Sequence, residues 1–99
     1  GNPLFEFYAA ITRQNHQGLP KGGWQSHEKI SKLNALKMFT SWAAYGAFDE
    51  NRRGKIAIGY DADLTILSND LLTIDASEIL NTQILGTIVN GKIIYTTLL

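Results

Sequence analysis

Apolar residues in the first part of the chain recur at the spacing of one helix face. This apolar stripe consists of Leu4, Phe7, Tyr8 and Ile11. Asn2 is a residue type that caps helices, and Pro3 suits the first helical position because its missing N–H would have no partner there. The pattern predicts a helix from Pro3 to about Gln14.

A second helix is predicted to begin at Ser31. The Ser31 hydroxyl is expected to cap it, and Ile30 is placed to pack against Ala35. The spacing assigns its apolar face to Leu33, Leu36 and Phe39 and places Lys32 and Lys37 outside.

A third, short helix is predicted over Trp42–Ala47, with Thr40 or Ser41 as its cap. Its small residues allow close packing against a neighbour. The charged stretch 49–54, Asp-Glu-Asn-Arg-Arg-Gly, is predicted to be a turn that ends the helical half.

The segment 15–29 between the first two helices has no periodicity and is predicted to be a loop. It is punctuated by Gly18, Pro20, Gly22 and Gly23. Loops of this length are often functional or mobile. Trp24 is expected to fold back and anchor the loop on the core; the alternative is a lid or recognition element.

The second half of the chain changes to period two, which predicts strands. A strand over Ala62–Leu67 is almost wholly apolar after Asp63, so both of its faces are expected to be covered. A helical turn over Ala76–Ile79 is predicted after Asp75 as its cap. Two further strands, Ile84–Val89 and Lys92–Thr96, flank Asn90-Gly91, a pair typical of a type I′ hairpin turn. The overall prediction is an α+β fold.

Composition narrows the class of protein. The chain has 99 residues, 44% of them hydrophobic and 18% charged, which is typical of a globular domain. Nine basic and nine acidic residues cancel, which argues against a nucleic-acid or acidic-membrane partner. The absence of Cys excludes disulfides, Cys-ligated zinc and thiol nucleophiles. No apolar run approaches the roughly 20 residues of a membrane helix, and the start at Gly1 lacks the basic region of a signal peptide.

Residues with candidate chemistry are few. His16 and His27 both fall in the loop 15–29 without metal-binding spacing, and we interpret them as solvated. Asp61 and Asp63 begin like a calcium loop, but Ile66 stands where that loop needs Gly. Gly54-Lys55 lacks the rest of a phosphate-binding loop. The aromatic residues at helical spacing are assigned to the core: Tyr8, Trp42, Tyr45 and Phe48.

Four stretches together resemble the amidohydrolase superfamily. Residues 54–67 read G-x-I-x-x-G-x-x-A-D-L-x-I-L, similar to the segment where these enzymes leave their barrel for a small β-sandwich. Residues 89–95 resemble the family's closing hairpin, and residues 31–44 resemble a helix pair that precedes it. Residues 2–13, from Asn-Pro to Thr-Arg, are similar to a helix of the amidohydrolase 3 branch.

The resemblance implies a parent enzyme with a metal-bearing (β/α)₈ barrel that hydrolyses non-peptide C–N bonds. The family's metal ligands are an H-x-H pair, a lysine or acidic bridge, two further histidines and an aspartate, and zinc is its most usual metal. That aspartate would precede Gly1, so no catalytic, cofactor-binding or metal-binding residue is assigned in this chain. We expect residues 1–53 to be the last helices of the barrel and residues 54–99 to be C-terminal strands of the sandwich.

This interpretation gives the chain a structural role in a cytoplasmic enzyme, with the remainder of the amidohydrolase chain as its partner. Two alternatives stay open: a free-standing interaction module of the same descent, and an unrelated α+β binding domain. Strands left without their neighbours would promote self-association through open edges. Within the signature, Gly54 and Gly59 are expected in tight turns where a Cβ would clash, and Asp63 is expected to accept amide bonds in its own turn.

Overall fold

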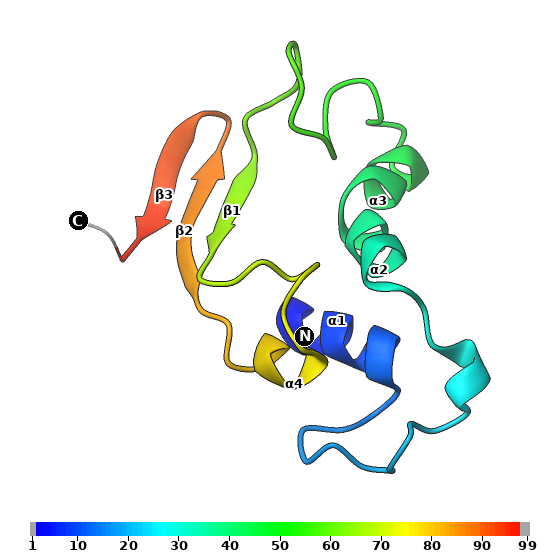
Figure 1. The fold of residues 1–99 in the computed structure, drawn as a ribbon. Helices are drawn as coiled ribbons and strands as arrows, with labels where there is room; N and C mark the ends of the chain where they lie inside the picture. Colours follow the sequence, from blue (N-terminus) through cyan, green and yellow to red (C-terminus); the bar gives the residue numbers. More distant parts are fainter. Residues whose placement is uncertain (1, 98–99) are drawn as a thin grey trace. The chain divides into compact units, whose positions relative to one another are not determined.

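The structure, a computed structural model, describes residues 2–97; Gly1, the start discussed above, lies outside the described residues. Its elements follow the order α, 3-10, α, α, β, α, β, β (Figure 1). Their bounds are α1 Pro3–Thr12, η1 Ser26–Glu28, α2 Lys32–Phe39, α3 Ser41–Gly46, β1 Leu64–Leu67, α4 Ala76–Ile79, β2 Ile84–Val89 and β3 Lys92–Thr96. The α+β prediction is confirmed.

The chain divides into two compact units, each made of two separate chain segments. Within the described residues, the first unit comprises 2–36 and 69–82, and the second comprises 37–68 and 83–97. These units are defined by compactness alone. The segments 1–53 and 54–99, drawn from the family resemblance, remain a prediction about the parent protein.

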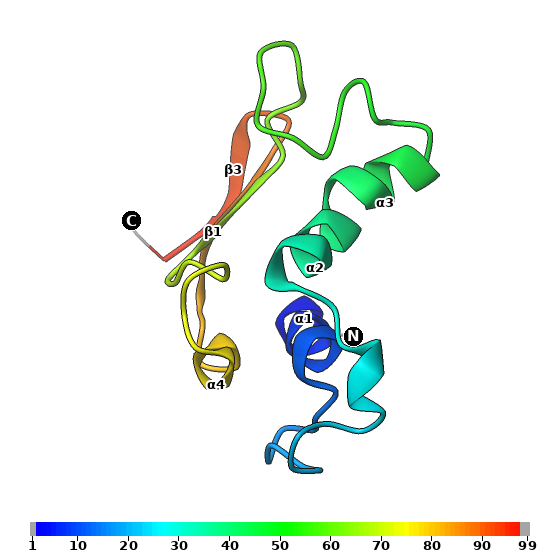
Figure 2. The same ribbon diagram turned by 45° about the vertical axis from the view of Figure 1, so that its right-hand side comes forward.

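The first unit is held by packing of α1 against α4 (Figure 2). Its buried apolar residues are Phe7, Tyr8, Ala35, Leu71 and Ile79, of which Ile79 is fully buried. The apolar stripe of the first helix therefore faces the core as predicted.

Local capping rules explain where the helices begin. The Asn2 side-chain oxygen accepts from the amides of Leu4 (3.0 Å) and Phe5 (3.4 Å), and the Ser31 hydroxyl accepts from the amide of Asn34 (3.1 Å), so both predicted caps are confirmed. The first helix ends earlier than predicted, because Arg13 takes a left-handed conformation with φ 59°.

Two expectations about the helices are wrong. Asp75 precedes α4, but its side chain makes no capping bond; its backbone carbonyl accepts from the Glu78 amide instead. In α2 the buried residue is Ala35, while Leu33 and Phe39 are exposed. The side of α2 that carries Lys32 faces the chain, since the Lys32 ammonium donates to the Ile74 carbonyl.

The strands form a three-stranded antiparallel sheet in the order β1-β2-β3. Leu64 pairs with Ile88 and Val89 pairs with Lys92. Asn90 and Gly91 form the two-residue turn with φ of 50° and 76°, which confirms the predicted type I′ hairpin. β1 is shorter than predicted, and its expected double coverage is wrong, because Ile66 is 39% exposed and no second layer of the second unit lies over it.

None of the helices within residues 2–97 has the length and apolar character needed to cross a membrane.

The hairpin gives a first testable prediction. A Cβ at Gly91 would meet no heavy atom within 4 Å, so substitution there tests backbone conformation alone. We expect Gly91→Val to lower the free energy of unfolding by about 1–2 kcal/mol, because a β-branched residue resists positive φ. Gly91→Asn is the control and should cost much less, since Asn tolerates this region. Urea denaturation measures both, and equal stability of the two variants would contradict the turn geometry.

Candidate functional site

The two histidines of the long loop lie in the first unit and do not form a metal site. The His16 ring stacks on Phe5 with 3.9 Å between centroids, and the His27 Nε2 lies 3.5 Å from a Glu28 carboxylate oxygen. Both histidines are exposed, as predicted. Among residues 2–97 no group of three or more His, Cys, Asp or Glu side chains is placed to hold a metal ion.

Trp24 does not anchor the loop on the core as expected, because its side chain is 60% exposed. The loop is instead held through its backbone: the Trp24 amide donates to the Arg13 carbonyl (2.9 Å), and the Arg13 Nε donates to the Trp24 carbonyl (3.0 Å). The Arg13 guanidinium lies 5.0 Å from the indole centroid. The tryptophan is therefore covered by an arginine rather than by the core.

The aromatic residues around α3 also differ from the prediction. Tyr8 is buried, but Trp42, Tyr45 and Phe48 are 49%, 68% and 91% exposed. The buried residue of α3 is Ala44, and the chain packs on this small side at Gly54. A helix that turns its small residues inward must turn its aromatic residues outward, which is why these side chains are not core.

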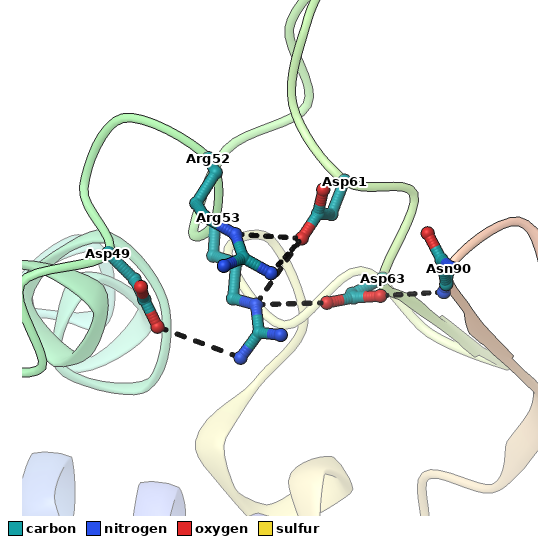
Figure 3. Close-up of polar contacts among 6 residues, drawn as sticks. All are labelled: Asp49, Arg52, Arg53, Asp61, Asp63 and Asn90. Carbon is teal, nitrogen blue, oxygen red and sulfur yellow. Dashed lines mark hydrogen bonds and ion pairs between the residues drawn. The ribbon is translucent and has the colours of Figure 1, made fainter.

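In the second unit, charged side chains gather where the family-like signature enters the sheet (Figure 3). We name this set the Arg53 cluster; it consists of Asp49, Arg52, Arg53, Asp61 and Asp63. Backbone bonds from the amides of both arginines to the Asp49 carbonyl (3.0 and 2.9 Å) form the turn that brings them here. A further bond from the Asp61 amide to the Arg52 carbonyl (2.8 Å) closes the loop 52–61.

Arg53 lies at the centre of the cluster and faces three carboxylates. Its Nη1 is 3.7 Å from Asp49 Oδ2, and its Nε is 3.4 Å from Asp61 Oδ2 and 3.7 Å from Asp63 Oδ2. Arg52 donates to the same Asp61 oxygen from Nε (3.3 Å) and Nη2 (3.2 Å). Guanidinium groups therefore face the oxygens that a calcium loop would need, which agrees with the prediction that this is a turn.

Asp63 joins the cluster to the hairpin. Its Oδ1 accepts from the backbone amide of Asn90 at 2.8 Å, and the neighbouring Ala62 carbonyl accepts from the Gly91 amide at 3.0 Å (Figure 3). The expectation that Asp63 caps amides of its own turn is thus wrong in its partner, because the amide belongs to a turn 27 residues further along the chain. The chemistry of the cluster is structural: acceptors and donors that fix where β1 begins.

Sequence reasoning missed Arg53 and Asn90. The i, i+4 spacing of Asp49 and Arg53 was an available signal for an ion pair. Asn90 contributes only its backbone amide, which every residue except proline carries, so no residue type could reveal this partner.

A second feature of the same unit is an open cleft of about 510 Å³ beside α3. Trp42 and Tyr45 line it from the helix, and Glu50, Lys55 and Tyr60 line it from the segment that follows. The Glu50 Oε2 atom is buried there and has no hydrogen-bond partner among the described residues. The cleft is suited to binding, since it brings together aromatic rings and an unsatisfied acceptor.

Comparison with known proteins gives a consistent result. The profile of the amidohydrolase family matches residues 2–95, a range that contains all four of the resembling stretches. A Bacillus subtilis (strain 168) protein named "Putative amidohydrolase YtcJ" is 34% identical over 94 residues, which are 95% of this chain and 18% of that protein. The chain thus spans less than a fifth of that relative's length. No solved structure matches.

The two signature glycines provide a matched test. A Cβ at Gly54 (φ +92°) would lie 2.9 Å from both the Ala44 Cβ and the Thr40 carbonyl oxygen. Gly59 has nearly the same φ (+88°) but open space around it, so the expected clash is confirmed at Gly54 and wrong at Gly59. We expect Gly54→Ala to cost about 2–4 kcal/mol of stability, from strain plus overpacking, and Gly59→Ala about 1–2 kcal/mol. Thermal and urea denaturation of both variants measure the difference, and equal losses would remove the close approach of Gly54 to α3.

The bond from Asn90 to Asp63 is tested by removing its acceptor. We expect Asp63→Ala to reduce the free energy of unfolding by about 1 kcal/mol, because the bond is solvent-accessible, and Asp63→Asn to cost less, because the amide oxygen still accepts. Asp75→Ala is the control, since that side chain makes no capping bond. Faster exchange of the Asn90 amide should accompany Asp63→Ala; unchanged exchange would show that the bond does not form.

Proposed function

The chain belongs to the amidohydrolase family, and we propose that it is the C-terminal portion of a metal-dependent enzyme that hydrolyses non-peptide C–N bonds. Its role there is structural: residues 1–53 supply the last helices of a (β/α)₈ barrel, and residues 54–99 supply strands of a small β-sandwich. The observation that carries this proposal is the family match over residues 2–95 of a chain that spans 18% of a relative.

The catalytic residues are proposed to lie in the rest of the protein. The side chains of residues 2–97 do not fit the divalent metal that the family implies, because His16 is stacked on Phe5, His27 is beside Glu28, and the aspartates of the Arg53 cluster face arginines. We therefore derive no catalytic step from this chain. Its contribution is to fold against the segment that carries the metal, which we propose to be zinc.

The proposed partner is the remainder of the amidohydrolase chain. In the second unit Phe48, Ile56 and Ile58 are 90% exposed or more. Isolated exposed apolar residues are ordinary, but three nearly complete exposures on one short stretch are typical of a surface that another segment covers. β1 and β3 are the outer strands of the sheet, and Ile93 and Ile94 of β3 are more than 60% exposed.

The open strands also support a second candidate, a free-standing interaction module that associates with copies of itself. An outer strand presents backbone groups that pair readily with another strand. The two candidates differ in what covers the exposed residues: the rest of an enzyme in the first, a second copy in the second.

Complementation tests the proposal. The 99-residue chain and the rest of the encoded protein are expressed as separate chains and assayed against a panel of amides. We expect neither to hydrolyse the panel alone and the mixture to do so, because the active site needs the fold completed. Phe48→Asp should weaken reconstitution at least tenfold, and Lys21→Asp, on an exposed loop of the other unit, is the control.

Three results would contradict the proposal. Elemental analysis could find about one zinc per isolated chain, lost on His16→Ala or His27→Ala. The encoded sequence upstream of residue 1 could lack an H-x-H pair. Light scattering could show a stable homo-oligomer that does not bind the rest of the protein, which would favour the interaction module.

A further inference from the structure

The carboxylate of Glu50 is the one side-chain group of the described residues whose oxygen is buried without a hydrogen-bond partner. The segment that carries it is fixed: the Tyr60 hydroxyl donates to the Glu50 carbonyl at 2.7 Å, and the Asp49 amide before it donates to the Ala44 carbonyl at 2.8 Å. A carboxylate oxygen removed from water needs a donor, and leaving it without one is unfavourable. The cleft beside α3 is therefore incomplete by one donor.

Two cations line the same cleft without supplying that donor. Lys37 and Lys55 are lining residues, yet neither is a hydrogen-bond partner of the Glu50 Oε2 within the described range. The Lys37 ammonium instead lies 6.0 Å from the centroid of the Trp42 ring. This contact shows that the ring face is open to cations.

The remaining lining identifies the missing group. The rings of Trp42 and Tyr45 are about half exposed or more at the cleft. A guanidinium is planar, stacks on aromatic rings and donates two parallel hydrogen bonds to a carboxylate, whereas an ammonium does neither as well. The side chain that satisfies the rings and the Glu50 oxygen together is arginine.

The charge of the cleft describes the neighbours of that arginine. Lys37, Lys55 and Glu50 leave the lining with a net charge of about +1, which would oppose an isolated cation. Acidic residues flanking the arginine would face the two lysines and remove this repulsion. Arg52 and Arg53 of this chain are already paired with aspartates, so the group comes from another polypeptide segment.

We propose that the cleft beside α3 is a docking site for an arginine flanked by acidic residues, with Glu50 as the carboxylate that receives the guanidinium. The site does not depend on hydrolytic activity, so it can fail while the enzyme assignment holds, or hold while that assignment fails. If the assignment holds, the arginine belongs to the rest of the protein.

A pair of peptides tests the docking site on the full 99-residue chain. Acetyl-Glu-Arg-Glu-amide is compared with acetyl-Glu-citrulline-Glu-amide, in which citrulline keeps the shape and loses the charge. Binding is followed by titration of tryptophan fluorescence and of the NMR signals of Glu50 and Tyr60. We expect the arginine peptide to bind roughly tenfold more tightly, the difference of one charged hydrogen-bonded pair.

Variants assign the preference to Glu50. Glu50→Gln should bring the ratio of the two affinities close to one, while Glu28→Gln, an exposed glutamate of the other unit, should leave it unchanged. Backbone NMR spectra establish that both variants keep the fold. Equal binding of the two peptides to the parent chain would overturn the proposal, and so would a preference that survives Glu50→Gln. A preference seen only after Lys37→Met and Lys55→Met would also overturn it, because the lysines would then be the natural partners of Glu50.

Discussion

The sheet of the second unit depends on the pair of hydrogen bonds that ties the start of β1 to the hairpin turn. Asp63 accepts from the Asn90 amide, and Ala62 accepts from the Gly91 amide. These bonds lie directly beyond the pairing of Leu64 with Ile88, so they continue the ladder where regular pairing ends. A shift of one residue would turn every side chain of β1 to the opposite face and would break both bonds. Register is thus fixed by one carboxylate and one carbonyl, with Arg53 holding the carboxylate in place.

Local rules were sufficient to predict most elements from the sequence. Asn2, Ser31 and the Asn90-Gly91 pair act on backbone groups within a few residues, so residue type alone reveals what they do. The same holds for the apolar stripe of α1, which needs only one buried neighbour to be correct. These features are confirmed because each depends on chemistry contained in a short stretch of chain.

Burial and long-range pairing could not be predicted in the same way. Trp42 and Phe48 have the residue type of a core, and their exposure follows from which side of α3 meets Gly54. Asp63 was recognised as an acceptor, but the identity of its donor depends on the folding back of a segment 27 residues away. The unsatisfied oxygen of Glu50 has no signal in sequence, because it is defined by what the surrounding atoms fail to supply.

The division of each unit into two chain segments has a consequence for the order of folding. The first unit needs α4, so α1 cannot complete its packing before residue 79 has left the ribosome. The second unit needs β2 and β3, which are among the last residues to be synthesised. Closing such long loops carries an entropic cost before any contact compensates for it. A nascent chain of this sequence therefore spends most of its synthesis without a finished core, the period in which exposed apolar side chains are most open to chaperones and to premature association.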